Sequence, residues 1–311
     1  MTDSSWQGRT AVITGAASGF GLETSRLAAQ KGMNVVMADV LEEPLAAAVK
    51  EVEALGVPVL PFKCDVRHAA EIEALGAATL ARFGAPHLVF NNAGVGAGGL
   101  IWEHTARDWE WVMGVNVMGV AHGVRVFTPM MLAAEKADPA YSGHIVNTAS
   151  MAGLVNMPNM GVYNVSKHAV VSLSETLYQD LKLVSERVHA HVLAPYFVPT
   201  GIAHSERARP DDAQEDGRKS TTSQRVAQGL IEKAVAGGRI TAADVAQFVF
   251  DALEADRFYI YSHPKALAPV GTRAEDILAA CRPAPAPSDG CRCRRGRLPA
   301  RRTRTARRPP P

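Results

Sequence analysis

The sequence predicts one α/β domain built on a doubly wound sheet of seven parallel strands, with helices on both faces. Short apolar runs alternate with longer segments of helical periodicity, and this alternation is typical of repeated β-α-β units. Several apolar runs are almost uninterrupted, as expected for strands that helices cover on both faces. In such a sheet ligands bind at the carboxyl ends of the strands, so functional residues are expected there.

The predicted elements follow one another along residues 1–270, which we expect to form the domain. Apolar and β-branched content predicts seven strands, at Thr10–Thr14, Asn34–Ala38, Val57–Lys63, His87–Asn91, His144–Thr148, His189–Ala194 and Phe258–Tyr261. Helical periodicity predicts helices around Phe20–Lys31, Pro44–Leu55, Ala69–Phe83, Thr105–Lys136 and Tyr163–Ser185.

Residues 199–240 interrupt this alternation between the sixth and seventh strands. The stretch Ser205–Ser223 is charged, poor in apolar residues and punctuated by Pro210 and Gly217. An insertion near the strand ends predicts a lid or substrate loop. A plain disordered surface loop is the alternative.

The charge of the chain is unevenly placed. Of 33 basic and 31 acidic residues, the tail 282–311 holds ten arginines and one acid, so residues 1–281 carry a net charge of −7. The tail is rich in Pro, Ala and Arg and has no periodicity, which predicts disorder. Because it has no aromatic residue for base stacking, we do not expect a nucleic-acid partner. An extension without a role fits the same composition.

Composition also bears on compartment and metals. No apolar run approaches the roughly 20 residues that span a bilayer, and Met1–Trp6 lacks the features of a signal peptide. A cytoplasmic protein without a membrane partner is therefore expected. The cysteines lack zinc-site spacing, so no metal is expected, and Cys64 is predicted to be a buried core thiol. The four are Cys64, Cys281, Cys291 and Cys293.

A glycine-rich turn joins the first strand to the first helix. A pyrophosphate binds well at a helix N-terminus, where free backbone N–H groups and the helix dipole favour an anion. Glycines let the backbone approach the phosphates because no Cβ stands in the way. The turn therefore predicts a Rossmann-like dinucleotide site that includes Gly15, Ser18, Gly19, Phe20 and Gly21.

Asp39 ends the second strand, eighteen residues beyond Gly21. An acid at this place accepts hydrogen bonds from the adenosine ribose hydroxyls and repels a 2′-phosphate. Neither position 18 nor position 40 holds an Arg or Lys that would attract that phosphate. NAD is therefore favoured over NADP. The alternative is a helix N-cap or a solvated acid.

Tyr163 and Lys167 stand four residues apart on a predicted helix, hence on one face. A free tyrosine has a pKa of about 10, and a fixed positive charge nearby lowers it by stabilising the phenolate. Ser150 follows the fifth predicted strand at its carboxyl end, where its hydroxyl could hold a carbonyl oxygen.

Across roughly residues 7–265 the sequence resembles the short-chain dehydrogenase/reductase family. The matching motifs occur in the family's order and at its separations. They are Thr14–Gly21, Cys64-Asp65-Val66, Asn91-Asn92-Ala93-Gly94, Asn116, Ser150, Tyr163 with Lys167, and Pro195–Thr200.

The resemblance implies hydride transfer between NAD(P) and an alcohol or ketone. Tyr163 would exchange the proton with the substrate oxygen, and Ser150 would orient that oxygen. Lys167 would bind the nicotinamide ribose and lower the pKa of the tyrosine. Asn116 would hold a water that links Lys167 to solvent; the alternative is a buried Asn with a structural role.

The resemblance also implies further cofactor contacts. Asp65 and Val66 would flank the adenine, and Val198 and Thr200 would contact the nicotinamide carboxamide. The chain departs from the family at Tyr196, where a glycine is usual after Pro195, so the local backbone path is in question. Other residues expected at the cofactor are Asn91, Asn92, Ala93, Gly94 and Pro195.

We expect the substrate pocket to comprise Val95–Leu100, Met151–Met160, Tyr196 and the lid. Its apolar members Met151, Leu154, Val155, Met157, Met160 and Tyr196 favour an apolar alcohol or ketone, although methionines often only fill a core.

Two further expectations concern assembly and the rival function. The family pairs subunits through helices that correspond to 105–136 and 163–185, so a homodimer or homotetramer is implied. The rival is a catalytically silent nucleotide-binding or scaffold protein on the same fold. The complete set of Ser150, Tyr163 and Lys167 argues against it.

Overall fold

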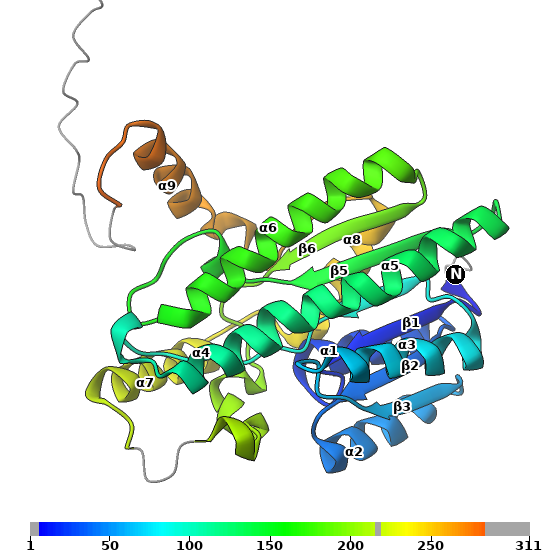
Figure 1. Cartoon of the computed structure of the whole chain (residues 1–311), viewed down its shortest axis with the longest axis horizontal. Coiled ribbons are helices and arrows are strands. Elements are labelled where there is room, and N and C mark those ends of the chain that lie inside the picture. Colours follow the sequence, from blue (N-terminus) through cyan, green and yellow to red (C-terminus); the bar gives the residue numbers. More distant parts are fainter. Residues whose placement is uncertain (1–5, 215–218, 284–311) are drawn as a thin grey trace, which may run out of the picture.

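The computed structural model describes residues 6–214 and 219–283. Its centre is one seven-stranded sheet in the order β3-β2-β1-β4-β5-β6-β7, with every neighbouring pair parallel (Figure 1). The predicted doubly wound fold is confirmed, and each predicted strand overlaps an observed one. The strands are β1 Thr10–Thr14, β2 Asn34–Asp39, β3 Val59–Lys63, β4 Leu88–Asn91, β5 Gly143–Thr148, β6 Val188–Ala194 and β7 Tyr259–Tyr261.

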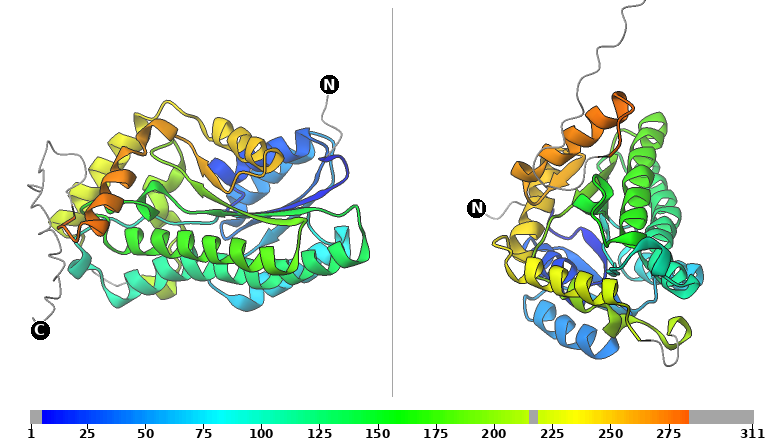
Figure 2. Two further views of the ribbon diagram at one scale, coloured as in Figure 1. Left: turned by 90° about the horizontal axis from the view of Figure 1, so that it is seen from above. Right: turned by 90° about the vertical axis from the view of Figure 1, so that its left-hand side faces the viewer.

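Helices cover both faces of this sheet (Figure 2). Neighbouring residues of a strand point to opposite faces, so Ile13 and Val12 enter different cores. Ile13 packs in a cluster with Val249 of α8, and Val12 packs in a cluster with Phe127 of α5. The helices are α1 Gly19–Gln30, α2 Glu42–Glu53, α3 Ala69–Phe83, α4 Ala106–Met113, α5 Gly119–Ala137, α6 Gly161–Val184, α7 Thr222–Ala236, α8 Ala242–Glu254 and α9 Ala268–Leu278.

The predicted helix Thr105–Lys136 is continuous but irregular, because a π-helical turn at Gly114–Met118 joins α4 to α5. The whole run is, among the described residues, the one helix long and apolar enough to cross a membrane. Core helices pass the same test. Here α5 contacts α3, β4 and β5, so the run gives no reason to place the chain in a membrane.

The structure adds helices that periodicity did not predict. The segment 199–240 is folded over its described part: it contains a 3-10 helix at Gly201–Ala208 and the helix α7, so the reading as a plain disordered loop is wrong there. α8 packs against α1, and α9 extends beyond residue 270. The expectation for the arginine-rich tail lies almost wholly outside the described residues, as do Cys291 and Cys293.

Histidines gather at the amino ends of the central strands. The Nδ1 atom of His144 on β5 lies 3.0 Å from Nε2 of His191 on β6, and both rings are buried. The Nδ1 atom of His191 lies 2.8 Å from the carbonyl oxygen of Arg257. If His191 donates to that carbonyl, its Nε2 accepts from His144, so two neutral rings satisfy the arrangement. Burial lowers the pKa of His191 to about 4 and holds the pKa of His144 well below its usual range.

Candidate active site and cofactor groove

The glycine-rich turn lies between β1 and α1, at the carboxyl end of the sheet. Gly15 and Gly19 have φ angles of 66° and 56°, a region that glycine adopts without strain. Both line the main cavity. Gly21 is not among the lining residues: a Cβ there would lie 2.1 Å from the carbonyl oxygen of Gly15. The third glycine therefore lets α1 pack against the turn, and its expected contact with the cofactor is not seen in the cavity wall.

Thr14 and Asn92 join the turn to the loop after β4. The Oγ1 atom of Thr14 accepts hydrogen bonds from the backbone N–H groups of Asn92 (3.0 Å) and Ala93 (3.1 Å). In return, Nδ2 of Asn92 donates to the carbonyl oxygen of Thr14 at 3.0 Å. Asn92, Ala93 and Gly94 consequently line the cavity beside the turn. Asn91 points away from it and donates to Asn147 in the sheet.

Asp39 is held in place beside the glycine turn. Its carboxylate accepts hydrogen bonds from the N–H of Ala17 and the N–H of Leu41, each at 3.0 Å. Leu41, and not Asp39, is the N-cap residue of α2, so the reading of Asp39 as that cap is wrong. The carboxylate lines the cavity at the end of β2, where the ribose acid was expected.

Asp65 and Val66 line the same groove after β3. The carboxylate of Asp65 pairs with the guanidinium of Arg67 at 2.7 Å. Arg67 also reaches Asp212 at 3.2 Å, in the segment that follows Gly201–Ala208. The groove is therefore bridged at this point by an ion pair that the sequence did not predict.

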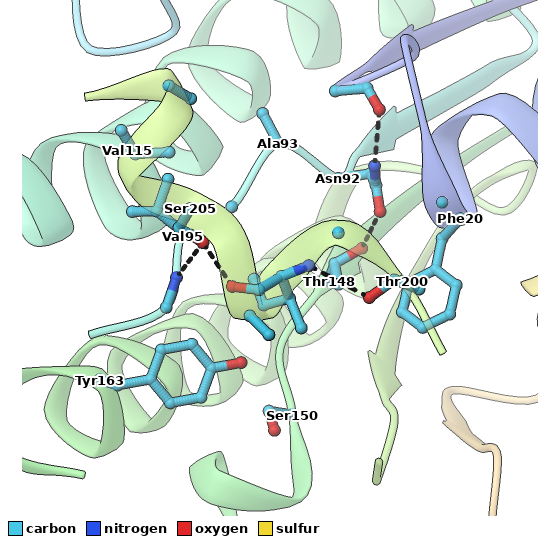
Figure 3. Close-up of a pocket in the computed structure, with 18 of the residues that line it drawn as sticks. Phe20, Asn92, Ala93, Val95, Val115, Thr148, Ser150, Tyr163, Thr200 and Ser205 are labelled. Atoms are coloured by element: carbon cyan, nitrogen blue, oxygen red, sulfur yellow. Dashed lines mark hydrogen bonds between the residues drawn. The ribbon is translucent and has the colours of Figure 1, made fainter. Parts of the chain in front are cut away.

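Ser150, Tyr163 and Lys167 come together on one wall of a cavity of about 360 Å³. The Nζ atom of Lys167 lies 5.7 Å from the centre of the Tyr163 ring and donates to the carbonyl oxygen of Thr148 at 2.9 Å. In Figure 3 the Tyr163 ring and the Ser150 hydroxyl lie on one side of the cavity, and Phe20 lies on the other. The structure thus brings the three predicted residues together.

Burial dominates the electrostatics of this wall. Burial raises the pKa of Tyr163, and a hydrogen bond with Ser150 lowers it in part. Burial also lowers the pKa of Lys167 to about 7. The expectation that Lys167 lowers the tyrosine pKa is thus not met by the chain alone. A lysine that is only partly charged near neutral pH, and 5.7 Å from the ring, does not offset the burial of the phenol.

Asn116 sits in the π-helical turn and is fully buried. Its Oδ1 accepts from the N–H of Val95 at 2.8 Å, and its Nδ2 donates to Val95 O and to Ser166 Oγ, both at 3.0 Å. Ser166 in turn donates to the carbonyl oxygen of Tyr163 at 2.8 Å. The side chain therefore joins the loop after β4 to the helix that carries the tyrosine, and it does not line the cavity. Irregular turns of this kind are frequent at functional sites.

The segment after β6 lines the cavity where predicted, with Pro195, Val198 and Thr200. Tyr196 lines it too. Its φ is not positive, so a side chain at this position is not strained. The ring contacts Phe197 and His263, with centroid distances of 4.7 and 5.8 Å.

The predicted substrate wall is largely present. Leu154 is an exception: it does not line the cavity and packs instead against a cluster that contains Val170 and Val171. Of the range Val95–Leu100, the lining residues are Val95, Gly96 and Gly98. The other apolar residues expected there do line the cavity, namely Met151, Val155, Met157, Met160 and Tyr196.

Residues 201–235 contribute a further wall, as expected for the predicted lid, although the sequence analysis named none of its individual residues. Ser205 fastens this wall to the loop after β4, because its Oγ accepts from the N–H of Gly96 at 2.8 Å. The start of α7 could have been found from Thr221 and Gln224, which form a capping box. The lining residues outside every segment predicted for the site include Arg67 and Trp111, and those of the lid include Ile202, Ala203, Ser205, Arg207, Gln228 and Ile231.

Comparison with known proteins agrees with this geometry. Residues 9–211 match the short chain dehydrogenase family. A CLA biosynthesis dehydrogenase/reductase of Lactiplantibacillus plantarum is 33% identical over 81% of this chain and 87% of its own. A 1-deoxy-11-beta-hydroxypentalenate dehydrogenase of Streptomyces avermitilis is 34% identical over 87% of this chain and 90% of its own.

A solved structure is similar over nearly the whole fold. It is a short chain dehydrogenase/reductase from Burkholderia phymatum in complex with NAD, with 50% sequence identity and a TM-score of 0.88. The match covers 91% of this chain and 99% of that one. With the glycine turn and the three polar residues on one cavity, these matches lead to one conclusion. The chain belongs to the short-chain dehydrogenase family and is an NAD(P)-dependent oxidoreductase that acts on an alcohol or its ketone.

Proposed function

We propose that the protein is an NAD-preferring dehydrogenase of an apolar alcohol, or reductase of the matching ketone, with Tyr163 as the general acid/base. One observation supports this most: Ser150, Tyr163 and Lys167 open on the same cavity as the glycine turn. A scaffold that only senses a nucleotide has no need of that arrangement.

The residues divide the chemistry between them. The nicotinamide ring, when bound, accepts a hydride from the alcohol carbon. The Tyr163 phenolate takes the hydroxyl proton, and in ketone reduction the phenol returns it. The Ser150 hydroxyl donates to the substrate oxygen and stabilises its developing charge. Lys167 would hold the nicotinamide ribose. The side chain of Asn116 fixes the helix that carries Tyr163 and Lys167, because it bonds to Val95 and to Ser166. A water beside Asn116 would link Lys167 to solvent.

Two aspartates and the loop after β4 support the cofactor assignment. Asp39 is fixed by two backbone N–H groups at the end of β2, and there its charge would face the adenosine ribose of a bound dinucleotide. That charge favours the two hydroxyls of NAD over the 2′-phosphate of NADP. Asp65 and Val66 would flank the adenine. The other residues that we propose to contact the cofactor are Gly15, Ser18, Gly19, Phe20, Asn92, Ala93, Gly94, Pro195, Val198 and Thr200.

The apolar part of the cavity lining supports an apolar substrate. Val155, Met157 and Met160 line it from the loop before α6, and Ile231 lines it from α7. Apolar walls with a few polar groups at one end are typical of sites that bind small apolar molecules.

We also propose a single domain over residues 1–270, with residues 199–240 as its lid, in a cytoplasmic homodimer or homotetramer. The exposed apolar side chains of Met118, at the end of the π-helical turn before α5, and of Val165 on α6 support pairing through these two helical runs. Their exposed fractions are 45% and 39%.

A screen of secondary alcohols and ketones with NAD(H) and NADP(H), followed by the absorbance of the reduced nicotinamide, tests the activity. The expected result is turnover of an apolar substrate with NAD(H) preferred. Tight binding of NADH together with no turnover of any substrate in the screen would favour the silent scaffold instead.

A further inference from the structure

Three cationic side chains of the described residues line the cavity, and they differ in the groups that they bond to. Arg67 is paired with Asp65 and Asp212. Lys167 is buried, has a pKa of about 7 and donates to a backbone carbonyl. Arg207 is the third, and none of the ion pairs found among residues 6–214 and 219–283 includes it.

Arg207 reaches from the lid segment Gly201–Ala208 to the glycine turn. Its Nη2 atom donates to the Oγ atom of Ser18 at 3.2 Å. The guanidinium lies over Gly201, where a Cβ would come within 2.3 Å of Nη2. A larger residue at 201 would therefore displace the guanidinium from the turn.

The glycine turn leaves room for an anion beside this guanidinium. Ser18 is the N-cap residue of α1, yet its side chain caps no N–H of that helix. The first turn of α1 contains no acidic residue. The positive end of the helix dipole and the charge of Arg207 therefore converge at the turn, and an anion placed there would be stabilised by both.

We propose that Arg207 binds the pyrophosphate of the dinucleotide from the lid side, with Ser18 positioning its guanidinium. This inference rests on the proposed binding of NAD in the groove. The bound phosphates then stabilise the 3-10 segment where it already lies, against the glycine turn. The pyrophosphate is favoured over a 2′-phosphate because the Asp39 carboxylate, bonded to Ala17 next to Ser18, keeps the ribose side negative.

The test compares three adenosine ligands that carry different phosphates. The affinities of ADP-ribose, adenosine and 2′-phospho-ADP-ribose are measured by displacement of NADH fluorescence, for the wild type and for Arg207→Gln. We expect Arg207→Gln to weaken the binding of ADP-ribose roughly tenfold, which is the effect of one charge-assisted hydrogen bond. The binding of adenosine should weaken by less than about twofold. Arg207→Lys keeps the charge and should retain most of the affinity.

A matched control comes from α7. Arg225 is exposed and does not line the cavity, and its guanidinium donates to Ser220 and Thr222. Arg225→Gln removes one positive charge from the same lid but leaves the lining of the groove unchanged. Its affinities for the three ligands should equal those of the wild type. Hydrogen exchange of residues 201–213 supplies a second readout: ADP-ribose should slow it in the wild type and not in Arg207→Gln.

Each other outcome counts against the proposal. An unchanged affinity of Arg207→Gln for ADP-ribose would overturn it. A loss confined to 2′-phospho-ADP-ribose would also overturn it, because the guanidinium would then lie at the ribose. If the wild type binds neither ADP-ribose nor NADH, the dinucleotide groove itself is wrong, and this result is distinct from a failure of Arg207 alone.

Discussion

The two ends of the sheet bury ionisable groups in different ways. At the carboxyl end, Tyr163 and Lys167 border a cavity, and burial shifts the pKa of both toward their neutral forms. At the amino end, His144 and His191 are buried just as deeply, but they bond to each other and to the backbone. At the carboxyl end, a bound ligand can still change the charge of Tyr163 and Lys167. At the amino end, the two histidines already satisfy each other's hydrogen bonds and need no ligand. We therefore expect substitutions at the carboxyl end to lower activity and substitutions at the amino end to lower stability.

The largest expected effect is at the carboxyl end. Tyr163→Phe removes the proton donor and acceptor and leaves the ring, so kcat/KM should fall about 10³-fold while the affinity for NADH stays within about twofold. The control is Tyr178→Phe on the same helix, whose ring packs on Phe258 outside the cavity and whose loss of the hydroxyl should leave turnover unchanged. Turnover of Tyr163→Phe close to that of the wild type would remove the acid/base role.

The next effect is at the amino end. His191→Leu leaves His144 and the carbonyl of Arg257 without their partner, so the free energy of unfolding should fall by about 2–3 kcal/mol. Denaturant unfolding measures this, and kcat at a temperature where the variant is folded should match the wild type. His204→Gln, an exposed histidine, serves as the control. A lower kcat of His191→Leu with an unchanged free energy of unfolding would show that the amino end does not serve stability alone.

A smaller effect concerns cofactor choice. Asp39→Ala removes the carboxylate that we propose to bind the ribose, so the ratio of kcat/KM with NAD to that with NADP should fall by about tenfold. The same kinetic assay with both cofactors measures the ratio. An unchanged ratio would show that Asp39 serves only to brace the glycine turn through Ala17 and Leu41.

The smallest effect is the response to acid. The folded-state pKa of His191, about 4, lies below the usual value of 6.5, so the unfolded chain binds the extra proton first as the pH falls. Its contribution to stability is therefore complete above pH 6.5 and is lost on acidification, by about 1 kcal/mol between pH 7 and pH 5.5. The free energy of unfolding should fall less steeply in His191→Leu over this range. If the free energy of unfolding falls equally steeply with pH in the wild type and in His191→Leu, His191 is not the group that binds the proton.

Much of the fold could be predicted because local patterns and global packing agree. The strand Thr10–Thr14 is found as predicted, since an apolar run covered on both faces leaves few alternatives. The helix α7 was missed because Ser, Thr and Gln obscure its periodicity, although its capping box marks its start. The π turn could not be foreseen, because it arises where Asn116 bonds to Val95 in another segment.

The site residues likewise divide into those that sequence motifs reveal and those that only the folded structure reveals. Ser150, Tyr163 and Lys167 were identified because they occur together with the glycine turn and Asn116, in the order and at the separations of a known family. Arg207 was not, because its role depends on a contact with Ser18 across 189 residues that no local pattern records. Gly21 was assigned to the cofactor from its motif, and only the packing at Gly15 shows that its small size serves the helix.

The proton transfer by Tyr163 is tested most directly by the pH dependence of alcohol oxidation. Because oxidation needs the phenolate and burial raises the tyrosine pKa, kcat/KM of the wild type should rise about tenfold per pH unit below that pKa. The residual rate of Tyr163→Phe should not vary with pH. The same rise in Tyr163→Phe would contradict the account, because another group would then be taking the proton.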